Sequence, residues 1–402
     1  MPEPVEVPKT ASKLLKPADL PDSFARSLYK VAPFRGCAHG CRYCDGRAER
    51  YYVEGDFERD VEIRRAIPDR LAGELPLVRE AGMIAFGSGV TDPYQPLEAV
   101  ERLSGSCAEL LAARSDSGAR PRLPALVMTK SSLVRRDLPA WRRVNEGPGF
   151  VLLVSLTSLD EELRSAIEPG ASSFADRLAT LRAFKEAGCA VGVLAMPFLP
   201  GLSDDEDSIR RLYAACSEIG VDFLMPGGLT LRPGRQKDFY LEKLAAFRPD
   251  LVEPTRSLYV EERPSGSATR KATRELFARI ASVRRDFALP YLLPHRVFAR
   301  LLPPHDATRL LLRDMLELYD ERGIDTAPLC SSADRYDAWL VDQRRAYRRR
   351  RNLPTDWLET RLAEALVSGE LDRVITNRKL SAFLHSVIDE GARLEYQTLK
   401  LS

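Results

Sequence analysis

The chain has 402 residues, 44% hydrophobic and 29% charged, so it can bury a large core and has the composition of an ordinary soluble protein. Its 60 Lys and Arg residues nearly balance its 58 Asp and Glu residues. The overall charge therefore argues neither for nor against a nucleic-acid partner, and only local basic patches could indicate one. The N-terminal sequence lacks the apolar segment of a signal peptide, and the run "CAVGVLAMPFLPGL" (189–202) is too short and too broken by Gly and Pro to span a bilayer. The seven cysteines are odd in number and scattered outside one cluster, which is not the pattern of a disulfide framework. We therefore expect a cytoplasmic protein with no membrane partner.

Short apolar runs alternate with helical patterns between residues 60 and 290. The predicted strands are "MIAFGS" (83–88), "ALVMTK" (125–130), "FVLLVSLT" (150–157), "CAVGVLAMPF" (189–198) and "VDFLMP" (221–226), preceded by a first strand at "DVEIRR" or just before residue 37. The predicted helices between them are 98–114, 137–146, 160–167, 174–188 and 203–220. This alternation predicts five or six βα units on a parallel sheet, as a partial or complete barrel or a doubly wound sheet. In such folds the chemistry lies at the carboxyl ends of the strands.

The remainder of the chain has a different pattern. A helical stretch (268–289) and a Pro-rich passage (293–306) lead into sequence whose only period is helical. We expect four regions: an N-terminal extension (1–30), a barrel core (31–235), a connecting region (236–300) and a helical C-terminal region (301–402).

Three of the seven cysteines lie within eight residues, in "GCAHGCRYC" (36–44). A zinc site normally needs a fourth ligand, and His39 is the only donor nearby. A redox pair would use Cys41 and Cys44 and leave Cys37 unexplained. A 4Fe-4S cluster held by three thiolates uses all three and leaves one iron open to a small molecule. Gly36 and Gly40 then supply the backbone freedom that a loop around a cluster needs.

The cysteine motif resembles the CxxxCx(aromatic)C signature of radical S-adenosylmethionine (SAM) enzymes. The landmarks "GSGVTDPYQPLE" (87–98), "TKSSLVRRDLP" (129–139), "SLTSLDEELRSAIEPGASSFADRL" (155–178) and "MPFLPGLSD" (196–204) follow it in order. Together they resemble the spore-photoproduct-lyase-like branch, often labelled DNA repair photolyases, over residues 30–235. The resemblance implies a partial (β/α)6 barrel of radical SAM type, with a mostly helical C-terminal extension.

The resemblance also implies the cofactors, a 4Fe-4S cluster on Cys37, Cys41 and Cys44 and a bound SAM that is cleaved to a 5′-deoxyadenosyl radical. Other implied contacts to SAM are Tyr43, Ser88, Asp92, Lys130, Ser155, Glu168, Arg177 and Ala195. Lys130 and Ser155 suit the carboxylate and the ribose or amine, Ser88 and Asp92 the methionyl amine, and Ala195 the adenine. Glu168 and Arg177 resemble the acid–arginine pair of the family, and Tyr43 occupies the aromatic position of the motif.

Two departures from the branch bear on the substrate. Many relatives have Tyr after the third cysteine, where this chain has Asp45. Spore photoproduct lyases carry a hydrogen-donating cysteine where this chain has Ser88, which argues against repair of spore photoproduct itself. Cys330 is an alternative donor, and Tyr94 a candidate for a substrate or radical-relay role.

Two basic runs raise the question of a nucleic-acid partner. "QRRAYRRRRNLP" (343–354) could bind phosphates and stack a base, or form a solvated helix paired with the acids of 356–366, which we favour. "LRPGRQKDFY" (231–240) is better placed to meet an anionic substrate. The leading substrate is thus a nucleic-acid base or lesion. The alternatives are a radical SAM enzyme that acts on a peptide, protein or small metabolite, and a non-catalytic iron–sulfur or zinc protein. A flavodoxin or ferredoxin is the expected reducing partner.

Overall fold

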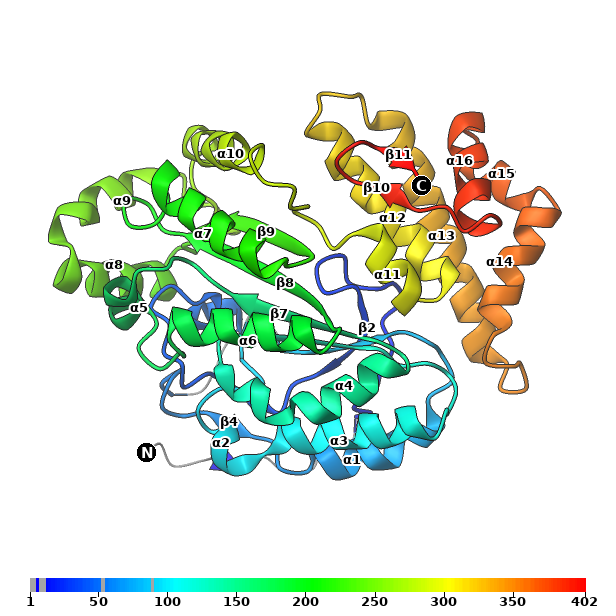
Figure 1. Cartoon of the computed structure of the whole chain (residues 1–402), viewed down its shortest axis with the longest axis horizontal. Helices are drawn as coiled ribbons and strands as arrows, with labels where there is room; N and C mark the ends of the chain where they lie inside the picture. The colour runs from blue at the N-terminus through cyan, green and yellow to red at the C-terminus, as the bar shows by residue number, and fades with distance from the viewer. Residues whose placement is uncertain (1–4, 7–11, 52–54, 88–89) are drawn as a thin grey trace.

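A six-stranded parallel sheet organises the first 230 residues of the protein (Figure 1). The structure is a computed structural model that describes residues 5–6, 12–51, 55–87 and 90–402. The strands are β2 (Ser27–Val31), β5 (Met83–Phe86), β6 (Ala125–Thr129), β7 (Phe150–Ser155), β8 (Ala190–Phe198) and β9 (Phe223–Gly228). Their order in the sheet equals their order in the chain. Each crossover therefore advances in the same direction, as in the wall of a barrel, and the predicted partial barrel is confirmed.

The first strand of this sheet is β2, which lies just before the cysteines. The other candidate, "DVEIRR", contributes β4 (Glu62–Ile63) to a separate three-stranded sheet with β1 (Val5–Glu6) and β3 (Phe34–Arg35). That small sheet flanks the cysteine loop, because β3 ends two residues before Cys37.

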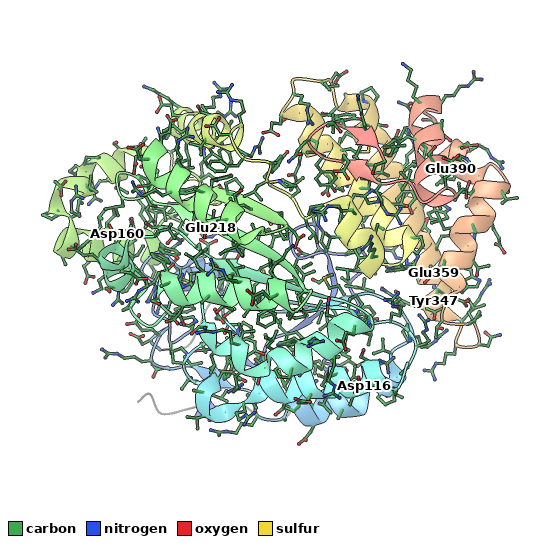
Figure 2. The ribbon with its side chains drawn as sticks, viewed as in Figure 1. Asp116, Asp160, Glu218, Tyr347, Glu359 and Glu390 are labelled. Carbon is green, nitrogen blue, oxygen red and sulfur yellow. The ribbon has the colours of Figure 1, made fainter. Side chains whose placement is uncertain are left out.

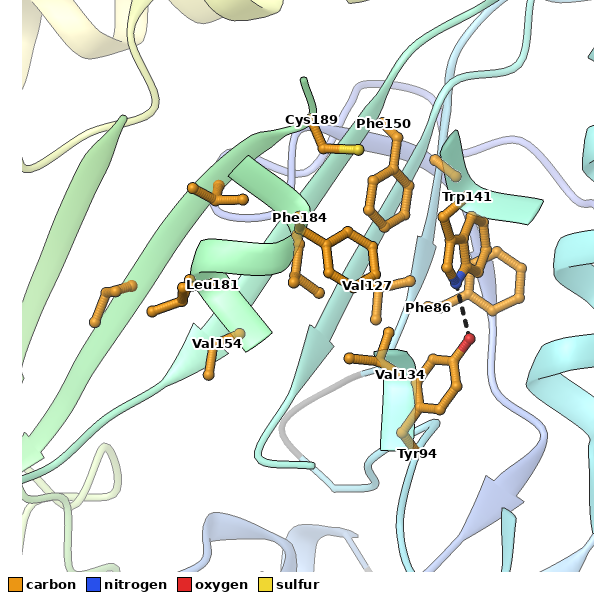
Figure 3. Close-up of a cluster of buried hydrophobic side chains, with 14 of the residues drawn as sticks. Phe86, Tyr94, Val127, Val134, Trp141, Phe150, Val154, Leu181, Phe184 and Cys189 are labelled. Carbon is orange, nitrogen blue, oxygen red and sulfur yellow. Dashed lines mark hydrogen bonds between the residues drawn. The ribbon is translucent and has the colours of Figure 1, made fainter. Parts of the chain in front are cut away.

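Helices cover the outer face of the six-stranded sheet. They are α1 (Ile67–Glu74), α3 (Leu103–Asp116), α4 (Leu138–Glu146), α6 (Phe174–Glu186), α7 (Glu206–Ile219) and α10 (Arg270–Arg284). Between them and the sheet lies an aromatic core in which Trp141 stacks on Phe150 with ring centroids 4.7 Å apart (Figure 3). Trp141 donates its indole N–H to the hydroxyl of Tyr94 at 2.8 Å. Tyr94 is fully buried in this outer core, which gives it a packing role.

The C-terminal region packs against the opposite face of the same sheet. Its helices are α11 (His295–Leu301), α12 (Pro304–Asp320), α13 (Ala327–Arg349), α14 (Trp357–Val367), α15 (Glu370–Ile375) and α16 (Arg378–Ile388), followed by a short hairpin of β10 (Leu394–Glu395) and β11 (Lys400–Leu401). Side chains alternate along a strand, so Ala85 and Leu153 point away from the outer core and join Phe298 and Leu311 in a second cluster. The sheet is therefore covered on both faces.

Two arginines of the run 344–351, Arg344 and Arg348, lie at this junction, and the other four are exposed. Arg344 is fully buried and donates to both oxygens of Asp306, at 2.7 and 2.6 Å, and to Glu80 at 3.3 Å. Tyr347, labelled in Figure 2, is buried too and donates its hydroxyl to the carbonyl of Arg79. The predicted helix is present as α13, but the acids that pair with its inward arginines precede the helix and do not follow it. A buried Tyr347 cannot stack a base.

In the part of the chain that the structure describes, no helix is long and apolar enough to cross a membrane.

Acid should weaken the protein through His295, because burial lowers the pKa of this imidazole to about 3 and its Nδ1 accepts a hydrogen bond from the backbone of Leu394. In the unfolded chain His295 binds a proton near pH 6.5, whereas in the folded protein it stays neutral until about pH 3. The free energy of unfolding therefore falls as the pH drops from 6.5 towards 3, by up to about 1.4 kcal/mol per pH unit. His295→Gln should lower this slope in urea titrations, and part of the slope that remains belongs to His305, whose pKa burial lowers to about 4. His385→Asn is the control, because its pKa is raised by Asp389 and it is charged in both states over that window. Equal slopes for wild type and His295→Gln would contradict the assignment.

Candidate active site

The three clustered cysteines lie on one loop beyond the carboxyl end of β2. Gly36 and Gly40 have φ values of +84° and +63°, and a Cβ on Gly36 would lie 2.9 Å from the carbonyl oxygen of Phe57. The backbone N–H of Cys37 donates to that same carbonyl at 3.0 Å. Glycine at position 36 thus allows a close approach that fixes the start of the loop.

All three cysteines line a single cavity of about 490 Å³. The cavity lies at the carboxyl ends of the parallel strands, where the fold is expected to place its chemistry. Burial raises the pKa of Cys37 well above its ordinary value and that of Cys41 to about 12, so both are protonated thiols at neutral pH in the free protein. Metal binding must release these protons, as it does for thiolate ligands in general. Among the described residues, no three His, Cys, Asp or Glu side chains converge on a point that could hold a single metal ion. The three cysteines instead line one cavity, which suits a cluster of several irons with one iron open to a small molecule.

One wall of the cavity is braced by a buried ion pair. Arg177 and Glu168 are both fully buried and form a salt bridge, and the hydroxyl of Tyr43 donates to the other carboxylate oxygen. Burial alone would raise the pKa of Glu168, but the charges of Arg177 and Lys130 lower it below its ordinary value. Arg177 also donates to the carbonyl of Ser155 at 3.0 Å. Glu168 and Arg177 therefore stand behind the wall and orient residues that face the cavity.

Another wall is built around Asp92, which lines the cavity. Its carboxylate accepts from Thr129 Oγ1 at 2.7 Å and from the backbone N–H of Lys130 at 2.8 Å. On the other side it lies 3.2 Å from Nε2 of His39, whose Nδ1 is 2.9 Å from the carbonyl oxygen of Gly170. Burial would raise the pKa of Asp92, but the His39 interactions and these hydrogen bonds keep it below its ordinary value. Asp92 thus joins the end of β6 to the cysteine loop.

Lys130 and Ser155 also line the cavity, at or just beyond the ends of β6 and β7. The ammonium of Lys130 lies 5.8 Å from the centroid of the Tyr43 ring. Burial lowers the pKa of Lys130, but the charges of the Cys41 thiolate, once it forms, and of the Glu168 carboxylate outweigh this and raise it, so the ammonium is charged. It is placed to meet an anionic group in the cavity.

The remaining predicted positions fall elsewhere. Ser88 lies outside the described residues. Ala195 is fully buried in the outer core, and its neighbours Leu194 and Met196 line the cavity instead. Cys330 is exposed on α13 and is not part of the cavity lining.

Sequence reasoning singled out Asp45 and His39 but did not predict their contacts in the site. Asp45 lines the cavity and accepts from Thr230 Oγ1 at 2.7 Å and from Gln236 Nε2 at 3.0 Å, which fastens the cysteine loop to β9 and α8 (Arg235–Phe247). His39, the nearby donor considered for a zinc site, contacts Asp92. Their positions within or next to the cysteine motif indicate that both residues belong to the site. Their contacts could not be predicted, because the partners lie far away in the sequence.

Comparison with known proteins agrees with this geometry. The Radical SAM superfamily profile matches residues 31–212. An uncharacterized protein of Mycobacterium tuberculosis is 33% identical over 237 residues, 58% of this chain and 67% of that protein. An uncharacterized protein of Acidianus two-tailed virus is 29% identical over 198 residues, 46% of this chain and 62% of that protein. The chain belongs to the radical SAM superfamily, as its cysteine motif predicted.

The fold is shared with spore photoproduct lyases. A lyase variant solved with bound AdoMet and dinucleoside spore photoproduct aligns with a TM-score of 0.51 and 19% identity, covering 71% of this chain and 79% of the lyase. At that identity the likeness shows the fold alone.

The buried ion pair between Arg177 and Glu168 should stabilise the fold. Arg177→Met leaves the Glu168 carboxylate without its main partner, and we expect a loss of about 3–5 kcal/mol in the free energy of unfolding, measured with urea. The double variant Arg177→Met/Glu168→Gln removes both charges and should recover part of the loss. A single variant within about 0.5 kcal/mol of wild type would contradict this role.

Proposed function

We propose that the protein binds a 4Fe-4S cluster through Cys37, Cys41 and Cys44 and holds SAM beside it. With both bound, the cofactors supply a 5′-deoxyadenosyl radical that abstracts a hydrogen atom from the substrate. The observation that carries this proposal is that the three cysteines line one cavity together with Lys130, Ser155 and Asp92.

The side chains of the cavity support distinct roles towards SAM. We assign the charged ammonium of Lys130 to the carboxylate of SAM, because a charge-assisted hydrogen bond suits that group. Ser155 faces the cavity and suits the ribose or the amine, and its backbone is held by Arg177. Asp92, with four contacts from the chain itself, holds the backbone at Lys130 in place as well as facing the ligand. Ser88 and Ala195 are assigned by resemblance alone.

The walls of the cavity support radical chemistry in another way. Tyr43, Asp92 and Cys41 are each at most 7% exposed, so bulk water has little access to the groups that surround the ligand. A dry site protects a reactive intermediate from side reactions. The protein's own contribution is position and exclusion of water.

Some cations of the two basic runs are already paired within the chain. Arg344 and Arg348 pair with Glu80. In the second run Arg232 pairs with Asp45, and Lys237 with Glu262. Cations that are already paired within the chain contribute less to phosphate binding, but Arg345, Arg349, Arg350 and Arg351 are exposed. A nucleic-acid base or lesion therefore remains the proposed substrate, with a peptide, protein or small metabolite as the alternative.

Three further proposals accompany this function. All seven cysteines are free, which supports a reducing cytoplasm. A flavodoxin or ferredoxin is the proposed electron donor. The four regions remain a proposal, except that the barrel begins at β2, before the proposed boundary at residue 31, and one hydrophobic cluster joins the barrel to the helical region (301–402).

The chemistry is tested by anaerobic reconstitution with iron and sulfide, reduction with dithionite in the presence of SAM, and chromatography of 5′-deoxyadenosine. We expect product from the wild type and none from Cys37→Ala/Cys41→Ala/Cys44→Ala, because the variant keeps no thiolate to hold the cluster. A wild type that binds only zinc, or a variant that still yields product, would contradict the proposal.

The role of Lys130 is tested by the dissociation constant for SAM, measured by calorimetry on the reconstituted protein. Lys130→Met should weaken binding by about 10- to 100-fold, the worth of one charge-assisted hydrogen bond. Lys30→Met is the matched control, since Lys30 lines the same cavity but its ammonium lies 3.1 Å from Asp22. Equal affinities for the two variants would remove Lys130 from the SAM site.

A further inference from the structure

A second cavity, of about 480 Å³, lies beside the first at the carboxyl end of β9. Its walls come from the loop between β8 and α7, from the end of β9, from α9 (Val252–Leu258) and from α10. Gly228, Leu229 and Thr230 line both cavities, so this short segment is the partition between them.

Two glycines, Gly227 and Gly228, lie where the segment between the two cavities begins, and they carry no side chains. A Cβ on Gly227 would lie 3.0 Å from Met196, which lines the first cavity, and a Cβ on Gly228 would lie 3.0 Å from Leu276, which lines the second. Consecutive residues of the strand thus face opposite cavities, and neither carries a side chain. The segment is held from outside, because Tyr259 donates its hydroxyl to the carbonyl of Leu229 at 2.8 Å. The two cavities therefore adjoin along this one short segment.

The second cavity is suited to an uncharged group. Most of its lining is apolar, with Phe198, Leu258 and Leu276 among the contributors. Among the described residues that line it, Arg279 is the one cation, and it already donates to the backbone of Asp204 at 2.9 Å and to its carboxylate at 2.7 Å. No cation there is left to meet a phosphate, and the exposed carboxylate of Glu275 would repel one.

The mouth of this cavity exposes an aromatic ring. Phe277 lines the cavity and is 43% exposed, which makes it one of the few large hydrophobic side chains at the surface of the described residues. Exposed apolar surface at the rim of a pocket is typical of a ligand-binding groove. An apolar pocket with a few polar groups is likewise the usual form of a small-molecule site.

The first cavity has the size of a single ligand site. Its volume of about 490 Å³ lies within the roughly 300–1,000 Å³ that one drug-sized ligand occupies. SAM and the cluster would take up that space, so a substrate needs adjoining room, and the second cavity provides it across a three-residue partition.

We propose that the second cavity binds an uncharged, largely apolar moiety of the substrate, such as an aromatic ring, while the reacting carbon lies over the first cavity. The identification of this ligand as the substrate rests on the proposed function. The binding of an uncharged aromatic group does not, because it depends only on the residues of the second cavity.

The probe is 5-fluoroindole, followed by fluorine NMR on the full chain without cluster. Ala272→Trp fills the second cavity from α10, and Ala278→Trp is the matched control, an exposed alanine of the same helix that does not line the cavity. We expect Ala272→Trp to weaken binding at least about tenfold and Ala278→Trp to change it less than about twofold. The anionic analogue 5-fluoroindole-2-carboxylate should bind at least about tenfold more weakly than 5-fluoroindole to the wild type.

Absence of binding at the solubility limit of the probe, equal affinities for the two tryptophan variants, or tighter binding of the carboxylate would each overturn the proposal. SAM cleavage, measured on the reconstituted holoenzyme, distinguishes failure of the second-cavity proposal from failure of the proposed function. If 5-fluoroindole binds as expected but wild type cleaves no SAM, the proposed function fails and the binding site stands. If SAM is cleaved and the probe does not bind, only the second cavity loses its assignment.

Discussion

The contacts of the buried Asp92 carboxylate are the constraint on which the rest of the site depends. Asp92 precedes α2 (Glu98–Glu101), yet it reaches the end of β6 through Thr129 and the cysteine loop through His39. One carboxylate thereby sets the distance between the two segments that carry Lys130 and Cys37. A buried charge is tolerated only when it is fully paired, and each of the groups around Asp92 helps to pair it.

The same principle explains the layers behind the cavity. Glu168 is fully buried between Tyr43 and Arg177, and Arg177 in turn holds the backbone of Ser155. Residues that face a ligand are placed accurately only when the groups behind them are locked by packing and hydrogen bonds. The C-terminal helices extend this support, because Arg344 reaches from α13 to Glu80, three residues before β5. The barrel and the helical region therefore form one connected scaffold around the site.

Much of the scaffold and part of the site could be predicted from sequence, because both depend on local patterns. Buried strands such as "FVLLVS" are read from short apolar runs. Lys130 and Ser155 come from the family resemblance, and both lie at strand ends, where such folds carry their chemistry. The contacts of Asp45 and Arg344 could not be predicted, because their partners are 185 residues away for Thr230 and 264 away for Glu80. Nothing local tells a buried arginine from a solvated one. The run 344–351 therefore suggested nucleic acid, while its inward members close the core.

We propose that three thiolates leave one iron of the cluster open to SAM. Electron paramagnetic resonance of the reduced, reconstituted protein is the most direct test of this open iron. We expect a 4Fe-4S signal in the wild type whose g values shift when SAM is added, and no such signal in Cys37→Ala. A cluster signal that SAM leaves unchanged at saturating concentration would contradict an open iron, and a cluster that persists without Cys37 would contradict the ligand set.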